Sequence, residues 1–256
     1  MSPPRVRFGF LFVLLLLPVA TARCDWSVVN RETHPGKTSA VTRDTLKLEE
    51  SVSGETAELQ LAVFDSARAT LRVIDQPTDS RRSLAAEMSA NECLAGVNGG
   101  YFDPEHAAVG LLVTGGHVVQ AQQKAKLLSG VVSVINGRVQ IQRASAFSMK
   151  RKPSEARQCG PFLVDGGKPM PGLNNTREAR RTFVVTLAGG RAAIGYCSSV
   201  TLAQLATVLA ASGLRVERAL NLDGGSSSAF WFAGEDGVFS ISEGKTVRDF
   251  LALVAK

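Results

Sequence analysis

Short turns built on glycine and asparagine constrain this chain more than any other feature. Gly115-Gly116, Asn136-Gly137 and Gly189-Gly190 each separate two apolar runs rich in valine, isoleucine and threonine. Such turns need φ above zero, which glycine and asparagine adopt readily, and they join neighbouring antiparallel strands. The sequence therefore predicts a β-sheet built largely from hairpins. The predicted strands are residues 59–64, 70–74, 110–114, 117–120, 131–135, 138–141, 183–187 and 191–196.

Two segments have the apolar spacing of helices, residues 83–93 and 201–210, with Thr201 as N-cap and Gly213 as C-terminal stop. The second is followed by an apolar run, residues 216–222, which gives a strand–helix–strand unit after the hairpins. We therefore predict an α+β fold with a mixed β-sheet, few helices and a single domain. The polar, basic segment 150–158 is the predicted long loop.

The N-terminus has the pattern of a signal peptide. Arg5 and Arg7 precede an apolar stretch, and small residues end at Ala22. The stretch is shorter than the roughly 20 residues that span a bilayer. We predict cleavage after residue 22, a mature domain of residues 23–256, and a secreted or periplasmic location. Lipidation at Cys24 is disfavoured because Arg23 precedes it, where such processing wants a small residue.

Charge and cysteine usage narrow the function classes. Loss of Arg5 and Arg7 with the signal peptide lowers the net charge from +6 to +4. The sequence has no Lys/Arg cluster with interleaved aromatic residues, so nucleic-acid binding is not expected. Neither a later membrane span nor a cofactor motif is visible. The mild positive charge is compatible with a basic pocket for a small anion. The four cysteines, at positions 24, 93, 159 and 197, have no metal or redox spacing, so no metal site is predicted, and structural disulfides or buried free thiols are favoured.

Three glycine-bearing segments end apolar runs with polar groups, at residues 95–104, 159–167 and 219–228. Paired glycines let a ligand approach the backbone and let successive N–H groups face an anion. For Asp165-Gly166-Gly167 we favour an ordinary turn. In the third segment Asn221 and Asp223 alternate with apolar neighbours, so a strand places both on one face.

Several motifs, in order over residues 90–254, resemble the phosphodiester glycosidase family. Asn98-Gly99-Gly100-Tyr101-Phe102 is similar to its Asn-Gly-Gly-Phe-Phe segment, and Leu127 to Val132 to its Leu-Leu-Ser-Gly-Val-Val stretch. Arg181-Thr182 matches an Arg-Thr pair, Asn221 to Ser226 resembles Asn-Leu-Asp-Gly-Gly-Gly, and Arg248 matches a C-terminal arginine. Ser226 stands in place of a third glycine, and Thr186 in place of a histidine.

The resemblance implies hydrolysis of the bond between a sugar's anomeric carbon and a phosphodiester, with release of free sugar. Asp223 would support the anomeric centre or activate water, and Asn98 and Asn221 would position hydroxyls or water. Asp103 is the candidate second carboxylate, although a turn start is its favoured role; Glu105 and Asp165 are weaker alternatives. The residues expected to bind substrate or phosphate are Arg181, Thr182, Arg248, Asn221, Gly224, Gly225, Ser226, Gly99 and Gly100. Arginines suit phosphate because the guanidinium binds it bidentately.

Two other functions stay open. A non-catalytic envelope or polysaccharide-binding protein would keep the fold and lose turnover, with Ser226 and Thr186 as traces. A metal-dependent phosphoesterase would use Asp103, Asp165 and Asp223 as ligands and leave phosphate on the sugar.

Overall fold

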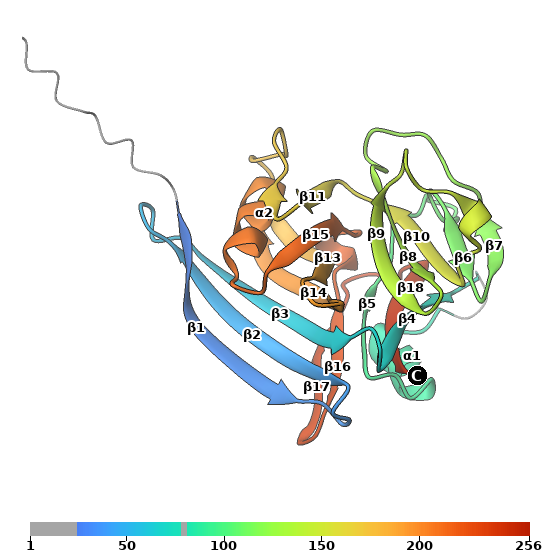
Figure 1. The fold of residues 1–256 in the computed structure, drawn as a ribbon, viewed down its shortest axis with the longest axis horizontal. Coiled ribbons are helices and arrows are strands. Elements are labelled where there is room, and N and C mark those ends of the chain that lie inside the picture. Colours follow the sequence, from blue (N-terminus) through green and yellow to red (C-terminus); the bar gives the residue numbers. More distant parts are fainter. Residues whose placement is uncertain (1–24, 78–80) are drawn as a thin grey trace, which may run out of the picture.

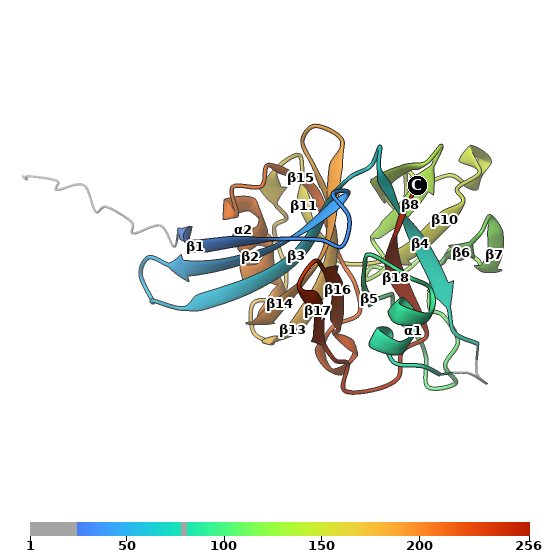
Figure 2. The same cartoon turned by 90° about the horizontal axis from the view of Figure 1, so that it is seen from below.

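The computed structural model describes residues 25–77 and 81–256, which form three β-sheets with two short α-helices. Figures 1 and 2 show the long strands β1–β3 on one side of the molecule, β6–β10 on the opposite side, and β16 and β17 between them. The predicted signal peptide and Cys24 lie outside the described residues. None of the helices that are described has the length and apolarity to cross a membrane.

The largest sheet has eight strands. Their order is β1 (Trp26–Pro35), β2 (Val41–Glu50), β3 (Thr56–Asp65), β14 (Arg191–Val200), β13 (Ala179–Leu187), β15 (Val216–Asn221), β11 (Phe162–Asp165) and β12 (Lys168–Pro169). Strand β13 is central and buried on both faces, which explains its continuous apolar run. Toward the outer edge, β2 alternates buried Leu46 and Leu48 with exposed Lys47 and Glu49.

The two other sheets have five strands each. One has the order β7 (His117–Gln120), β6 (Leu112–Thr114), β10 (Glu155–Cys159), β8 (Gly130–Ile135) and β9 (Arg138–Arg143). The other has the order β17 (Gly237–Ile241), β16 (Phe230–Gly234), β5 (Ala95–Asn98), β18 (Asp249–Ala255) and β4 (Ala69–Asp75). The helices are α1 (Leu84–Ala90) and α2 (Leu202–Ala211), with single 3-10 turns at Met149–Arg151 and Gly225–Ser227.

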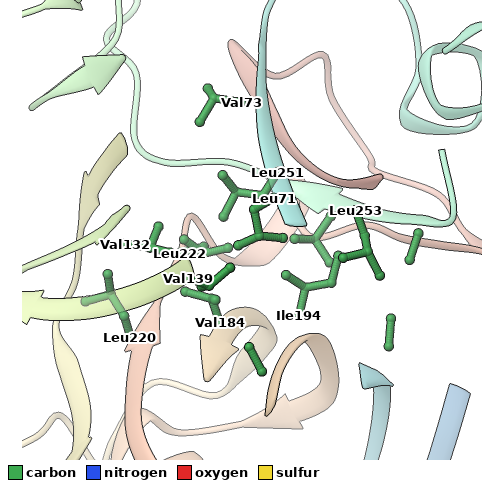
Figure 3. Close-up of a cluster of buried hydrophobic side chains, with 14 of the residues drawn as sticks. Leu71, Val73, Val132, Val139, Val184, Ile194, Leu220, Leu222, Leu251 and Leu253 are labelled. Atoms are coloured by element: carbon green, nitrogen blue, oxygen red, sulfur yellow. The ribbon is translucent and has the colours of Figure 1, made fainter. Parts of the chain in front are cut away.

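The main core lies where the three sheets meet (Figure 3). Val184 and Leu220 come from the large sheet, Val132 from one small sheet, and Leu71 and Leu251 from the other. All are at most 2% exposed, and burying one such side chain stabilises a fold by about 1.5–3 kcal/mol. The sheets are therefore fixed against one another by shared apolar contacts, and polar groups at their junction are held in place.

The predicted hairpins and the second helix are confirmed. Gly115-Gly116, Asn136-Gly137 and Gly189-Gly190 all have positive φ and join the expected antiparallel pairs, β6–β7, β8–β9 and β13–β14. Thr201 caps α2 in a reciprocal capping box with Gln204, and Gly213 follows the helix with φ of 71°. The predicted first helix is shorter than expected, with Ser83 as its N-cap.

The predicted single-domain fold of hairpin-built sheets with few helices is confirmed, but the sheets are antiparallel rather than mixed, because every strand pairing in the described part of the chain is antiparallel. Strands β14 and β15, on either side of α2, do run in the same direction. They do not pair, since β13 lies between them and bonds to both. The α2 crossover therefore passes over one strand.

The predicted long loop at residues 150–158 is also wrong. Only its first part is irregular; the rest enters strand β10, where Ala156, Arg157 and Gln158 are buried. The segment was predicted as a surface loop because its sequence is polar and basic. Its residue Arg157 is nevertheless buried inside the protein. A buried arginine is paired rather than solvated, and sequence polarity does not reveal the partner.

Disulfides are not found among the described cysteines. Cys93, Cys159 and Cys197 are buried free thiols, and they belong to three different hydrophobic clusters. The expectation of disulfides among these three is therefore wrong, and the alternative of buried free thiols holds for them. Burial raises the pKa of the Cys93 thiol to about 11, which keeps it protonated at neutral pH.

Candidate functional site

The candidate site lies where the large sheet meets the sheet that contains β5. Strand β15 ends at Asn221, and the chain continues through Leu222 and Asp223 into the 3-10 turn Gly225–Ser227. The Leu222 amide donates to the Thr182 carbonyl of β13, and the Asp223 amide donates to the Gly99 carbonyl just after β5. Asp223 therefore connects two sheets by backbone hydrogen bonds, which fixes its position.

Asn98 and Thr182 fix the backbone of Asp223 through hydrogen bonds to its carbonyl oxygen. The Asn98 side-chain amide donates to the Asp223 carbonyl at 2.7 Å, and the Thr182 hydroxyl donates to the same oxygen at 2.8 Å. The Asn98 side-chain oxygen accepts from the Ala229 amide. Both side chains are fully buried. These two predicted residues therefore lie next to Asp223, in positions that orient it.

The Asp223 carboxylate is partly exposed and has two hydrogen-bond donors. The Gly224 amide donates to one oxygen at 3.0 Å, and the Ser227 hydroxyl donates to the other at 2.5 Å. Burial raises the pKa of Asp223, and the negative charge of Asp249 adds to the rise; the Ser227 hydroxyl, Lys245 and the Gly224 amide oppose it. The result is an oriented carboxyl group with an elevated pKa, which suits acid–base or nucleophilic chemistry.

Two cations lie near this part of the site, Arg181 next to the Gly224 backbone and Lys245 close enough to Asp223 to act on its charge. Arg181 donates from Nε to the Val200 carbonyl and from Nη2 to the Arg177 carbonyl. Its Nη1 has no hydrogen bond in the described structure and lies 3.4 Å from where a Cβ at Gly224 would be. Lys245, exposed, lies over the Phe102 ring and lowers the pKa of Asp223. These groups can hold an anion next to Asp223.

The glycine turn itself completes this side of the site. Gly224 and Gly225 are half-buried, Ser226 is exposed, and the Ser226 carbonyl accepts from the Gly244 amide. The first N–H groups of a 3-10 turn have no partner inside the turn. The structure therefore brings Gly224, Gly225 and Ser226 together with Arg181 and Asp223.

Buried Asn221 and half-buried Tyr101 form a polar pair near Asp223. The Asn221 amide donates to the Tyr101 hydroxyl at 3.3 Å and to the Gly160 carbonyl at 3.0 Å. The Tyr101 hydroxyl donates to the same Gly160 carbonyl, and burial raises the pKa of Tyr101 well above its usual range. The Asn221 side-chain oxygen is buried with no hydrogen-bond partner in the described residues.

Gly99 and Gly100 pack against a buried ion pair that the sequence did not suggest. Arg157 and Asp249 are both fully buried, and Arg157 Nε lies 3.0 Å from Asp249 Oδ1. A Cβ at Gly99 would lie 1.7 Å from Asp249 Oδ1, and one at Gly100 would lie 2.5 Å from the Arg157 guanidinium carbon. Arg157 also donates to the Tyr101 carbonyl. The glycines are thus required here for close packing, and the ion pair supports the backbone next to Asp223.

Arg248 has other partners. Its Nε and Nη2 donate to the two carboxylate oxygens of Asp75 at 2.8 and 2.9 Å, and its Nη1 donates to the His106 carbonyl. His106 Nε2 is buried without a partner in the described structure, and burial lowers the pKa of His106. A phosphate contact by Arg248 stays a prediction, and it requires the Asp75 pair to open.

The other carboxylates have separate positions. Asp103 starts a turn, as favoured: its carboxylate accepts from the Ala107 amide, and its carbonyl accepts from His106. Asp165 lies in the β11–β12 hairpin and pairs with Arg143 and Arg218, while Glu105 is exposed. Among residues 25–77 and 81–256, no three His, Cys, Asp or Glu side chains gather as a metal would require. The three ligands of the phosphoesterase alternative thus form no cluster.

Sequence reasoning missed Ser227, Lys245, Arg157 and Asp249. Ser227 had a signal, since it follows the glycine pair within a serine run. Lys245 and Asp249 come from the C-terminal segment, and Arg157 was assigned to a loop. Nothing in their local sequence indicates that they meet near Asp223.

The family model described as phosphodiester glycosidase matches residues 91–254. No curated protein matches. The zebrafish N-acetylglucosamine-1-phosphodiester alpha-N-acetylglucosaminidase catalytic domain, auto-inhibited by its pro-peptide, is similar in structure with a TM-score of 0.67 at 15% identity, and the match covers 89% of each chain.

A hypothetical protein from Synechocystis is also similar, with a TM-score of 0.62 at 13% identity over 89% of this chain and 64% of that one. At such identities the likeness shows the fold alone. The family match spans well over half of the chain and contains Asn98, Arg181, Asp223 and Arg248. The chain therefore belongs to the phosphodiester glycosidase family.

Proposed function

We propose that the protein hydrolyses the glycosidic bond between a sugar's anomeric carbon and the phosphate of a phosphodiester, and that it releases free sugar. The observation that carries this proposal is the Asp223 carboxyl group, which is oriented by two donors, with Lys245 acting on its charge and Arg181 next to the adjoining Gly224. Family membership and the similarity to the zebrafish enzyme support the reaction class.

The division of labour follows from the leaving group. Cleavage of the bond to the anomeric carbon releases a phosphate monoester as a stabilised anion, so the site needs positive charge for the phosphate more than a strong proton donor. The free Nη1 of Arg181, the ammonium group of Lys245 and the amides that open the turn Gly225–Ser227 supply it. Asp223 is then left for the anomeric carbon.

Asp223 has two roles compatible with this arrangement. As a base it activates water for attack on the anomeric carbon, which inverts the configuration; as a nucleophile it forms a glycosyl-enzyme that water then opens, which retains it. Burial raises the pKa of Asp223, which makes its ionised carboxylate a stronger base and nucleophile than a solvent-exposed aspartate, as both roles require. The configuration of the released sugar separates the two roles.

The Asn221 side-chain oxygen, which has no hydrogen-bond partner in the described structure, is a further acceptor near Asp223. A buried carbonyl oxygen without a partner carries a desolvation cost of about 1–3 kcal/mol, which a donor from water or a sugar hydroxyl would offset. Asn221 is therefore proposed to orient a hydroxyl or the attacking water. Its own amide is already bonded to Tyr101 and Gly160, which fixes the direction of the oxygen.

The test is product identification with matched variants. The purified protein is incubated with a panel of sugar-1-phosphodiesters, including N-acetylglucosamine-1-phospho compounds, and products are identified by mass spectrometry. Free sugar is expected. Asp223→Asn should lower kcat by at least about 100-fold, without loss of Tm, because asparagine can still accept from the Gly224 amide and donate to Ser227.

Asp236→Asn is the matched control, since Asp236 is an exposed carboxylate in the β16–β17 turn. It should keep full activity. Sugar phosphate among the products would replace the proposal with phosphoester cleavage. Binding without any turnover across the panel would replace it with the non-catalytic function.

A further inference from the structure

A charged cavity lies away from Asp223. Its volume is about 1180 Å³, and it lies among the turns that follow β3, β8, β11, β13 and α2. We define the basic groove by its five cationic lining residues, Arg138, Arg191, Arg215, Arg218 and Lys256. They are far apart in the sequence, so the fold, not a local motif, brings them together.

The groove has an excess of positive charge. Its acidic lining residues are Asp65, Asp165 and Glu217, which leaves a surplus of two positive charges. Asp165 is already neutralised by Arg143 and Arg218. Asp65 accepts a hydrogen bond from the Ala67 amide.

Three of the arginines have no protein partner. Arg138, Arg191 and Arg215 are exposed, and within the described structure their guanidinium groups make neither ion pairs nor hydrogen bonds. Each stands next to a tight turn, which limits how far its backbone moves. Guanidinium groups without protein partners are available to bind phosphate bidentately, and several in one groove raise the local concentration of an anionic ligand.

The groove is distinct from the candidate active site. Strand β13 connects the two, with Thr182 beside Asp223 and with Thr186 and Leu187 in the groove lining. Five residues of extended strand separate Thr182 from Leu187, which corresponds to about 17 Å. One small substrate therefore does not fill both.

The size of the groove favours an extended ligand. Its volume exceeds the roughly 300–1,000 Å³ of sites for small molecules. Gln140, Gln142 and Thr186 supply donors and acceptors for hydroxyl groups between the cations. This combination of dispersed arginines and neutral polar groups matches a chain of sugars joined by phosphates.

We propose that the basic groove binds the phosphate-bearing part of a polymeric glycan, at a distance from the bond that is cleaved. The inference rests on the proposed function for its biological meaning, but it concerns a separate surface. If the groove has this role, the natural substrate is a polymer of sugar phosphates. The groove then lowers KM for that polymer without contacting the reacting atoms.

The test compares two triple charge reversals of equal net charge. Arg138→Glu, Arg191→Glu and Arg215→Glu together remove the groove's unpaired cations. The control combines Lys37→Glu, Lys47→Glu and Lys150→Glu, which are exposed lysines outside the groove. Binding of a fluorescent oligomer of N-acetylglucosamine-1-phosphate is measured for the native protein and both variants, with neutral dextran and inorganic phosphate as competitors.

The groove variant should bind the oligomer at least about tenfold more weakly than the native protein, while the control changes little. KM for the oligomer should rise in parallel, and kcat/KM for a monomeric sugar phosphodiester should not change. Dextran should not compete. Competition by inorganic phosphate at concentrations equal to the oligomer's phosphates would mean a site for the free anion and would overturn the polymer assignment.

Native protein that fails to bind the oligomer would also overturn the inference, as would equal losses in both variants. The proposed function fails separately, through the absence of any free sugar. Oligomer binding that depends on the groove, without turnover, would keep this inference and reject the enzymatic proposal.

Discussion

The buried ion pair between Arg157 and Asp249 gives the strongest quantitative prediction. Neither side chain is exposed, and Asp249 accepts from the Arg157 guanidinium and from the Gly100 amide. Asp249→Ala would leave the Arg157 charge buried without a counterion. Breaking a buried pair in this way costs about 3–5 kcal/mol.

Calorimetry and chemical denaturation measure this cost. For a protein of this size each kcal/mol shifts Tm by about 2–4 °C, so Asp249→Ala should lower Tm by about 6–20 °C. The Gly99 carbonyl accepts from the Asp223 amide, so the same variant should lower kcat/KM at temperatures where it is still folded. The change connects a buried charge to the geometry of the site.

The control is a pair at the surface. Asp165 and Arg143 have side chains 31% and 39% exposed, and losing such a pair costs about 0–1 kcal/mol. Replacing both buried residues, Arg157→Met with Asp249→Leu, should cost less than the sum of the single changes, because no charge is left unpaired. If Asp249→Ala costs no more than Asp165→Ala, the argument that Arg157 depends on Asp249 is refuted.

Three further predictions concern the site. Ser227→Ala removes a donor that stabilises ionised Asp223, so the pKa of Asp223 should rise further. The acid limb of the pH profile of kcat/KM should then move to higher pH, and an unmoved limb would show that Asp223 is not the group that titrates there. Lys245→Met removes a positive charge beside Asp223, so KM for a phosphodiester should rise about fivefold in steady-state assays, and less at high salt. Gly99→Ala forces a Cβ to within 1.7 Å of the Asp249 carboxylate and should cost about 1–3 kcal/mol in denaturant melts, whereas Gly244→Ala, with ordinary contacts of 3.5 Å and more, should stay within about 0.5 kcal/mol.

The parts of the fold that the sequence predicted depend on local backbone chemistry. Positive φ at Asn136-Gly137 and Gly189-Gly190 is a property of those residues, so the hairpins could be recognised before any contact was known. The capping box of Thr201 and Gln204 is equally local. Antiparallel order around β13 was not predictable in this way, because the α2 crossover is compatible with adjacent or separated strands.

For the candidate site, the sequence by itself determined the glycine segments and their polar residues, including Asn98 and Asp223, and the family resemblance added Thr182. Within each glycine segment, the polar residues and the glycines are close in sequence and follow an apolar run, so both features can be read directly from the sequence. Only the tertiary structure decided that Asn98 and Thr182 hold the Asp223 backbone and that Arg248 pairs with Asp75.

The tertiary structure alone also brings Lys245 to Asp223, buries Arg157 against Asp249, and places Thr186 in the basic groove. The physical reason is the same in each case. A charge is stabilised by whichever partner the packed sheets bring within a few ångströms, and that partner lies far away along the chain.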